Sequence, residues 1–128
     1  MANVILLDDE EDIRVEFAAF LQSMGHEVQT AGSIKQFLAL FLTHPPDLAL
    51  IDRNLPDGDG LELVKSLREQ GVRCGVIMFT ARDATQDRID GFRTGVDHYL
   101  TKPVRLQELA AVMQSLTWDC NLPPVGVW

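Results

Sequence analysis

Cysteines, histidines and long apolar runs are all scarce in this chain of 128 residues. Its two cysteines, Cys74 and Cys120, form no CxxC pair and no disulfide framework, which favours a reducing compartment. The longest apolar runs are short, such as residues 37–42, whereas a membrane-spanning helix needs roughly 20 apolar residues. No basic and then apolar leader opens the sequence, so we expect a cytoplasmic protein without a signal peptide or membrane contact.

Basic residues are also in the minority. The 11 Lys and Arg residues stand against 19 Asp and Glu residues, which gives a formal net charge of −8. Such an acidic segment is repelled by nucleic acid phosphates, so we expect DNA binding only through another domain. The histidines share no metal-ligand spacing, which argues against zinc, and neither a GxxxxGK nor a GxGxxG phosphate loop occurs.

Short apolar runs alternate with amphipathic stretches along the chain. Apolar runs predict five strands, at residues 3–7, 27–31, 47–51, 75–79 and 97–100. Helical spacing predicts five helices, at residues 13–24, 34–41, 61–67, 83–94 and 106–116. Ser33 and Gln36 form a capping-box signature before the second helix. This alternation predicts an α/β fold with a parallel sheet covered on both faces, and the half-polar second run suits an edge strand.

Polar residues follow the predicted strands. Asp8 and Asp9 come after the first strand, Asp52 after the third, Thr80 after the fourth and Lys102 after the fifth. Ligands of such sheets bind beyond the carboxyl ends of the strands, so we expect these side chains to meet there. Carboxylates about 4 Å apart repel by on the order of 4 kcal/mol, and Mg²⁺ relieves that repulsion. Lys102 and Thr80 suit phosphoryl oxygens, and Asp52 is the candidate nucleophile.

Each of these residues also has an ordinary explanation. Asp8 or Asp9 could be a helix N-cap, and Asp52 could begin a turn with Asn54 and Pro56. Thr80 could be a turn residue and Lys102 a solvated lysine. An aspartyl-nucleophile phosphohydrolase would need a second acid two residues after Asp52, where Asn54 stands, so the sequence favours holding a phosphoryl group over rapid turnover.

Several longer motifs carry a resemblance to a known family. They are VILLDDEEDIR, LALIDRNLPDGDGLELVKSLR, VIMFTAR, GFRTGVDHYLTKP and LQEL. Together they resemble the receiver domains of two-component response regulators, from about residue 3 to residue 116. The resemblance implies a doubly wound five-stranded parallel sheet of flavodoxin-like order 2-1-3-4-5. We expect a receiver domain at residues 1–117. Residues 118–128 show no helical pattern and are expected to be a tail or linker to an effector domain of a longer regulator.

The resemblance implies roles for the acidic residues. Asp52 would accept a phosphoryl group from a phosphohistidine of a sensor histidine kinase or phosphotransfer protein. Asp9 would bind Mg²⁺ directly, Asp8 mainly through water, and Asn54 through its backbone carbonyl. The chain would thus be a signalling phosphoacceptor that catalyses only its own phosphorylation and dephosphorylation.

The resemblance also implies roles for residues around the phosphoryl group. Lys102, the hydroxyl of Thr80 and the backbone amide of Ala81 would hold its oxygens. Tyr99 would turn inward when Thr80 moves, and the Lys102–Pro103 peptide bond would be cis.

Phosphorylation would switch the face formed by the fourth helix, fifth strand and fifth helix, and thereby control an output, which we expect to be transcription. Regulators that dimerise through this face use charge pairs, one of which Arg88 and Glu108 match. His98 and Val112 depart from that pattern, so a homodimer of this kind is one possibility among others. Arg82, two residues after Thr80, is expected to slow dephosphorylation. Two other functions stay open: a Mg²⁺-dependent phosphohydrolase using Asp52, and a binding module that is never phosphorylated.

Overall fold

The five predicted strands form one parallel sheet. The computed structural model describes residues 2–80 and 95–121. In sheet order the strands are β2 (Glu27–Ala31), β1 (Asn3–Leu7), β3 (Leu48–Asp52), β6 (Gly75–Thr80) and β7 (His98–Thr101). Every neighbouring pair is parallel. The predicted fold class, the strand order and the edge position of the second strand are confirmed.

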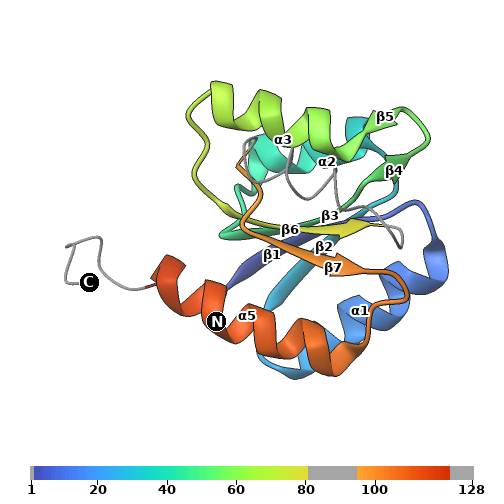
Figure 1. The fold of residues 1–128 in the computed structure, drawn as a ribbon, viewed down its shortest axis with the longest axis vertical. Coiled ribbons are helices and arrows are strands. Elements are labelled where there is room, and N and C mark those ends of the chain that lie inside the picture. The colour runs from blue at the N-terminus through green and yellow to red at the C-terminus, as the bar shows by residue number, and fades with distance from the viewer. Residues whose placement is uncertain (1, 81–94, 122–128) are drawn as a thin grey trace.

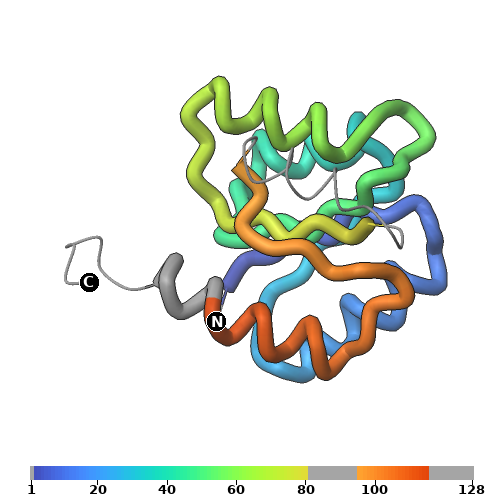
Figure 2. Tube along the Cα trace, in the orientation of Figure 1, coloured from blue at the N-terminus to red at the C-terminus, as the bar shows by residue number. Residues whose placement is uncertain are grey.

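Helices cover both faces of this sheet (Figure 1). Helices α1 (Glu11–Ser23) and α5 (Leu106–Asn121) lie on one face, and α2 (Ile34–Thr43) and α3 (Gly60–Glu69) lie on the other. Figure 2 traces how the chain leaves α1, passes to the opposite face for α2 and α3, and returns for α5. The helix predicted at residues 83–94 lies outside the described residues.

The last helix is longer than the sequence predicted. Helix α5 continues to Asn121, so the first four of residues 118–128 are helical although their sequence shows no helical pattern. Neither proline nor glycine interrupts residues 106–121, and the first proline beyond them is Pro123. The helix can therefore continue through residues 118–121, although these residues do not extend its apolar face. The division into a domain and a linker stays a prediction.

Two apolar layers hold the sheet between its helices. All residues of β3 and β6 are buried, as expected for central strands covered on both sides. One layer packs under α2 and α3 around Phe37, Val64 and Leu67. The other packs under α1 and α5 around Phe17 and Leu109, and there Phe17 meets Phe79 edge to face at 5.8 Å. Such packing makes the carboxyl ends of the strands a rigid base for side chains.

Helix α2 begins with the predicted capping signature, in a modified form. The N-cap Ser33 accepts a hydrogen bond from the backbone amide of Gln36 at 3.2 Å. The Gln36 side chain accepts from the amide of Gly32 at 2.7 Å, one residue before the position that a standard capping box uses. A distant carboxylate completes the cap, because Asp57 accepts from the amides of Ile34 (2.9 Å) and Lys35 (3.1 Å).

Asp57 belongs to a small hairpin that the sequence did not predict. Strands β4 (Asn54–Leu55) and β5 (Gly58–Asp59) pair antiparallel directly after β3. Arg53 binds both carboxylate oxygens of Asp59, at 2.8 and 3.1 Å, and Asp59 caps α3 by accepting from the amide of Leu61. The loop after β3 is therefore tied to the first turns of both α2 and α3. Among the described residues, no helix has the length and apolar character required to cross a membrane.

Candidate functional site

Four chain segments meet at the carboxyl edge of the sheet. Asp8 follows β1, Asp52 and Thr80 are the last residues of β3 and β6, and Lys102 follows β7. Asp8, Asp52 and Thr80 are also the buried polar or charged residues of the described parts of the chain, with exposed fractions of 0%, 3% and 2%. Burying two carboxylates costs free energy unless a cation or hydrogen bonds compensate. Their concentration at one edge therefore marks a functional site.

Lys102 is the cation at the centre of this site. Its Nζ lies 2.9 Å from Asp52 Oδ2, 3.5 Å from Asp8 Oδ2 and 3.7 Å from Glu10 Oε1. Burial lowers the pKa of Lys102, but the hydrogen bond and charge of Asp52, with the charges of Asp8 and Glu10, outweigh it and leave that pKa raised. The ammonium therefore stays protonated in the physiological range. The reading of Lys102 as a merely solvated lysine is wrong.

Asp8 carries a buried carboxylate oxygen that lacks a hydrogen bond. Its Oδ1 accepts from the amide of Glu10 at 2.9 Å, whereas its Oδ2 has no hydrogen-bond partner among the described residues. Burial raises the pKa of Asp8, the Glu10 amide opposes that rise, and the charge of Asp52 adds to it. The N-cap of α1 is Glu10, without a side-chain capping bond, so the alternative that Asp8 or Asp9 caps this helix is wrong. Asp8 Oδ2 is suited to a cation.

Three acids could hold a metal ion together. Carboxylate oxygens of Asp8, Asp9 and Glu10 all lie within 4.8 Å of one another, and Asp9 and Glu10 are exposed. Sequence reasoning selected the first two and missed Glu10. The signal was present, because Glu10 belongs to a run of four acids directly after the first strand. Oxygen ligands with open sides suit a hard, partly hydrated divalent cation.

Asp52 is held on both of its carboxylate oxygens. Oδ1 accepts from the backbone amide of Asn54 at 3.1 Å, and Oδ2 accepts from Lys102 Nζ. The predicted turn at Asp52 is thus present together with its place in the site. Gly60, the first residue of α3, packs directly against the backbone of Asp52, because a Cβ at position 60 would lie 2.3 Å from the Asp52 carbonyl oxygen. The side chain of Asp52 keeps only 4% exposure, and the ammonium of Lys102 covers its Oδ2 at 2.9 Å.

The remaining predicted residues lie near this centre or outside the described residues. The backbone amide of Lys102 donates to the carbonyl of Thr80 at 2.8 Å, which ties β6 to the start of the last loop. Tyr99 is buried at 8% exposure in the apolar layer under α2 and α3. The Lys102–Pro103 peptide bond is cis. Ala81, Arg82 and Arg88 lie outside the described residues.

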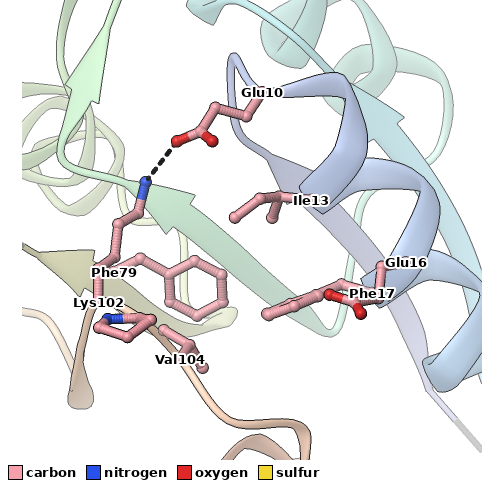
Figure 3. Close-up of a pocket in the computed structure, with 8 residues that line it drawn as sticks. Glu10, Ile13, Glu16, Phe17, Phe79, Lys102 and Val104 are labelled. Carbon is pink, nitrogen blue, oxygen red and sulfur yellow. Dashed lines mark ion pairs between the residues drawn. The ribbon is translucent and has the colours of Figure 1, made fainter.

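A hollow of about 410 Å³ opens beside Lys102 (Figure 3). Ile13 and Phe17 of α1 face Phe79 and Val104 across it, and the Lys102 side chain passes along its edge toward Glu10. With 26% exposure, that side chain is not enclosed.

The buried Asp8 carboxylate predicts a pH-dependent gain of stability on its removal. Its pKa is raised above 3.8 in the folded state, so the folded protein holds this proton where the unfolded chain has lost it. The free energy of unfolding that Asp8 contributes therefore falls as the pH rises from 3.8 through the raised pKa of the folded state. In chelator at neutral pH we expect Asp8→Asn to unfold a few degrees higher than the native protein, with the difference shrinking as pH falls toward 4. Thermal unfolding at several pH values measures this. A variant less stable than native at pH 7 would contradict it.

Comparison with known proteins gives a consistent picture. Residues 4–114 match the profile of the response regulator receiver domain. The virulence transcriptional regulatory protein PhoP of Salmonella typhimurium is 35% identical over 135 aligned positions, which cover 99% of this chain and 60% of the relative. The transcriptional regulatory protein PhoP of Escherichia coli is 34% identical over 113 positions, covering 88% of this chain and 51% of the relative. The chain thus spans about half to three fifths of these relatives.

Solved structures resemble the fold closely. The receiver domain of the TMAO respiratory system response regulator TorR has a TM-score of 0.89 and 31% identity, covering 94% of this chain and 100% of the other. The receiver domain of the Francisella response regulator 1452 has a TM-score of 0.88 and 32% identity, covering 93% and 98%.

Proposed function

The chain belongs to the response regulator receiver domain family, and from this premise we propose that Asp52 accepts a phosphoryl group from a phosphohistidine of a sensor histidine kinase or phosphotransfer protein. One observation carries the proposal. Lys102 Nζ lies 2.9 Å from Asp52 Oδ2, at a sheet edge where the carboxylate of Asp8 is also buried. A buried carboxylate beside a lysine and a cation site has the features of an activated nucleophile.

The acidic residues of this edge fit Mg²⁺. Asp8 and Asp9 would hold it with Asp52 and the backbone carbonyl of Asn54, and Glu10 lies close enough to contribute. Asp8 Oδ2 supports this assignment, because it accepts no hydrogen bond from the described residues and Lys102 Nζ lies 3.5 Å away, so a bound metal ion would compensate its charge. When bound, Mg²⁺ supplies charge neutralisation for the oxygens of a transferring phosphoryl group.

The chemistry at Asp52 is an in-line displacement. A carboxylate oxygen of Asp52 attacks phosphorus, the P–O bond forms, the P–N bond to the donor imidazole breaks, and that imidazole leaves with its electron pair and takes up a proton. Lys102 then pairs with a phosphoryl oxygen in place of Asp52 Oδ2, and Thr80 with the amide of Ala81 would hold the others. Asn54 offers no carboxylate to activate water, so the acyl phosphate would persist.

The product would act as a switch. It adds about one unit of negative charge at the sheet edge and attracts Lys102 and Thr80. Tyr99 would follow Thr80, and the face of residues 83–94, β7 and α5 would change. We propose that this face controls an effector domain of a longer regulator, with transcription as the output. A second copy of the chain could also bind this face. His98 and Glu108 are exposed there, whereas Val112 packs against the core under α1 and α5, so a homodimer would need other contacts as well.

Intact-mass measurement separates this function from its alternatives. The chain is incubated with Mg²⁺ and a small acyl phosphate, and again with excess chelator. We expect a single adduct of about 80 Da that forms with Mg²⁺ and is largely lost without it. Steady release of inorganic phosphate from phosphoesters over many turnovers would identify a phosphohydrolase instead. No adduct under either condition would leave a binding module.

A further inference from the structure

Arg14 makes a contact that no part of the proposed chemistry uses. It lies half-buried in the first turn of α1, and its Nη1 donates to the backbone carbonyl of Asp8 at 2.7 Å. Its own amide donates to the carbonyl of Glu10 at 3.1 Å, which begins the helix. Arg14 therefore connects α1 to Asp8 and to Glu10, the first and last of the three acids that could hold a metal ion.

The Asp8 carbonyl needs this donor because the sheet does not supply one. The ladder between β1 and β2 ends with Leu7 opposite Ala31, and the amide of Asp8 still donates to Ala31 at 3.1 Å. The next amide of this parallel pattern that would face the Asp8 carbonyl is that of Ser33, where β2 has ended and the chain turns into α2, and among the described residues it makes no hydrogen bond to that carbonyl. Because Asp8 is fully buried, an unpaired carbonyl would cost free energy there. Arg14 satisfies it from the side.

Gly32 makes room for the guanidinium. A Cβ at position 32 would lie 3.0 Å from Arg14 Nη1 and 3.4 Å from its Cζ, so a side chain there would push the guanidinium a few tenths of an ångström out of its place. The sequence thus provides both the donor and the space that it occupies.

We propose that Arg14 is a positioning residue, which fixes the backbone at Asp8 so that the carboxylates of Asp8, Asp9 and Glu10 converge as a cation site. This rests on the proposed function. Electrostatics alone predicts the opposite consequence, because a positive charge beside an acidic group opposes cation binding and its removal should tighten it. The sign of the change in affinity therefore distinguishes positioning from charge.

Calorimetric titration with Mg²⁺ alone measures that sign. We expect Arg14→Gln to bind Mg²⁺ about tenfold more weakly, as the loss of a residue that orients metal ligands does. Arg14→Lys keeps one donor and is expected to retain most of the affinity. Lys65→Gln, at an exposed position on α3, removes the same charge far along the chain and should leave affinity unchanged. Arg14→Gln binding as tightly as native, or more tightly, would overturn the proposal.

Gly32→Ala gives a test without any change of charge. It should weaken Mg²⁺ binding less than Arg14→Gln does, because it shifts the guanidinium rather than removing it. It should add little in the Arg14→Gln background, because both changes act on one contact. Additive effects would overturn the proposal.

A metal-free readout keeps the two claims apart. The Glu10 amide, which donates to Asp8 Oδ1, should exchange its hydrogen faster in Arg14→Gln than in native protein. If the native chain binds no Mg²⁺, the proposed metal site fails. Unchanged Glu10 exchange would then reject the role of Arg14 separately.

Discussion

The Asp52→Asn variant is expected to gain no phosphoryl group under conditions that modify the native chain completely. An amide at this position keeps the size of the side chain and an oxygen that can accept from the Asn54 amide, but it lacks the carboxylate nucleophile. The fold should survive, because the change also removes one of two buried like charges. Intact mass measures the modification, and thermal unfolding reports the fold.

A matched variant controls for the change of charge. Asp12→Asn makes the same substitution at an exposed position in the first turn of α1. It should be modified as readily as native protein. An Asp52→Asn protein that is folded and still modified at the native rate would refute the assignment of the acceptor.

The Gly60→Ala substitution is expected to destabilise the fold by about 3 kcal/mol or more. A Cβ at position 60 would lie 2.3 Å from the carbonyl oxygen of Asp52, 2.9 Å from Ile51 Cγ2 and 3.2 Å from the Cα of Arg53. Two of these atoms belong to the backbone at the end of a fully buried strand, so they cannot yield as a flexible side chain would. Against a typical total stability of about 5–15 kcal/mol, this loss is large.

Urea unfolding measures the effect, and a second glycine separates its causes. Gly71 has a φ of +84° and nothing within 4 Å of an added Cβ, so Gly71→Ala should cost only about 1 kcal/mol of conformational strain. If Gly60→Ala lowered the free energy of unfolding by no more than Gly71→Ala does, the close contact between Gly60 of α3 and the Asp52 backbone would be contradicted.

The parts of the fold that the sequence predicts are those with a local pattern. Continuous apolar runs mark β3 and β6 as buried parallel strands, and the half-polar residues 27–31 mark the edge. The placing of Asp52 and Lys102 at one edge follows from strand order alone, because parallel strands end together.

What the sequence did not reveal depends on contacts between distant segments. Asp57 caps a helix that begins 23 residues earlier, and no local rule links the two. Within the run of acids, the sequence does not show which side chain is buried. Asp8 extends the hydrogen bonding of β1 and is buried, whereas Asp9 and Glu10, which follow it, are exposed. No sequence pattern singles out Arg14 and Gly32 either, because their role depends on a tertiary contact: the Arg14 guanidinium packs against Gly32.

The residue that carries the phosphoryl group is the most direct test of the whole account. The chain modified by a small acyl phosphate with Mg²⁺ is treated with borohydride, which reduces an aspartyl phosphate to homoserine, and its peptides are sequenced by mass spectrometry. We expect homoserine at position 52 and unchanged aspartate at positions 8 and 9. Homoserine at either of those positions with Asp52 intact, or a phosphoryl group retained on a histidine, would contradict the assignment of Asp52 as the acceptor.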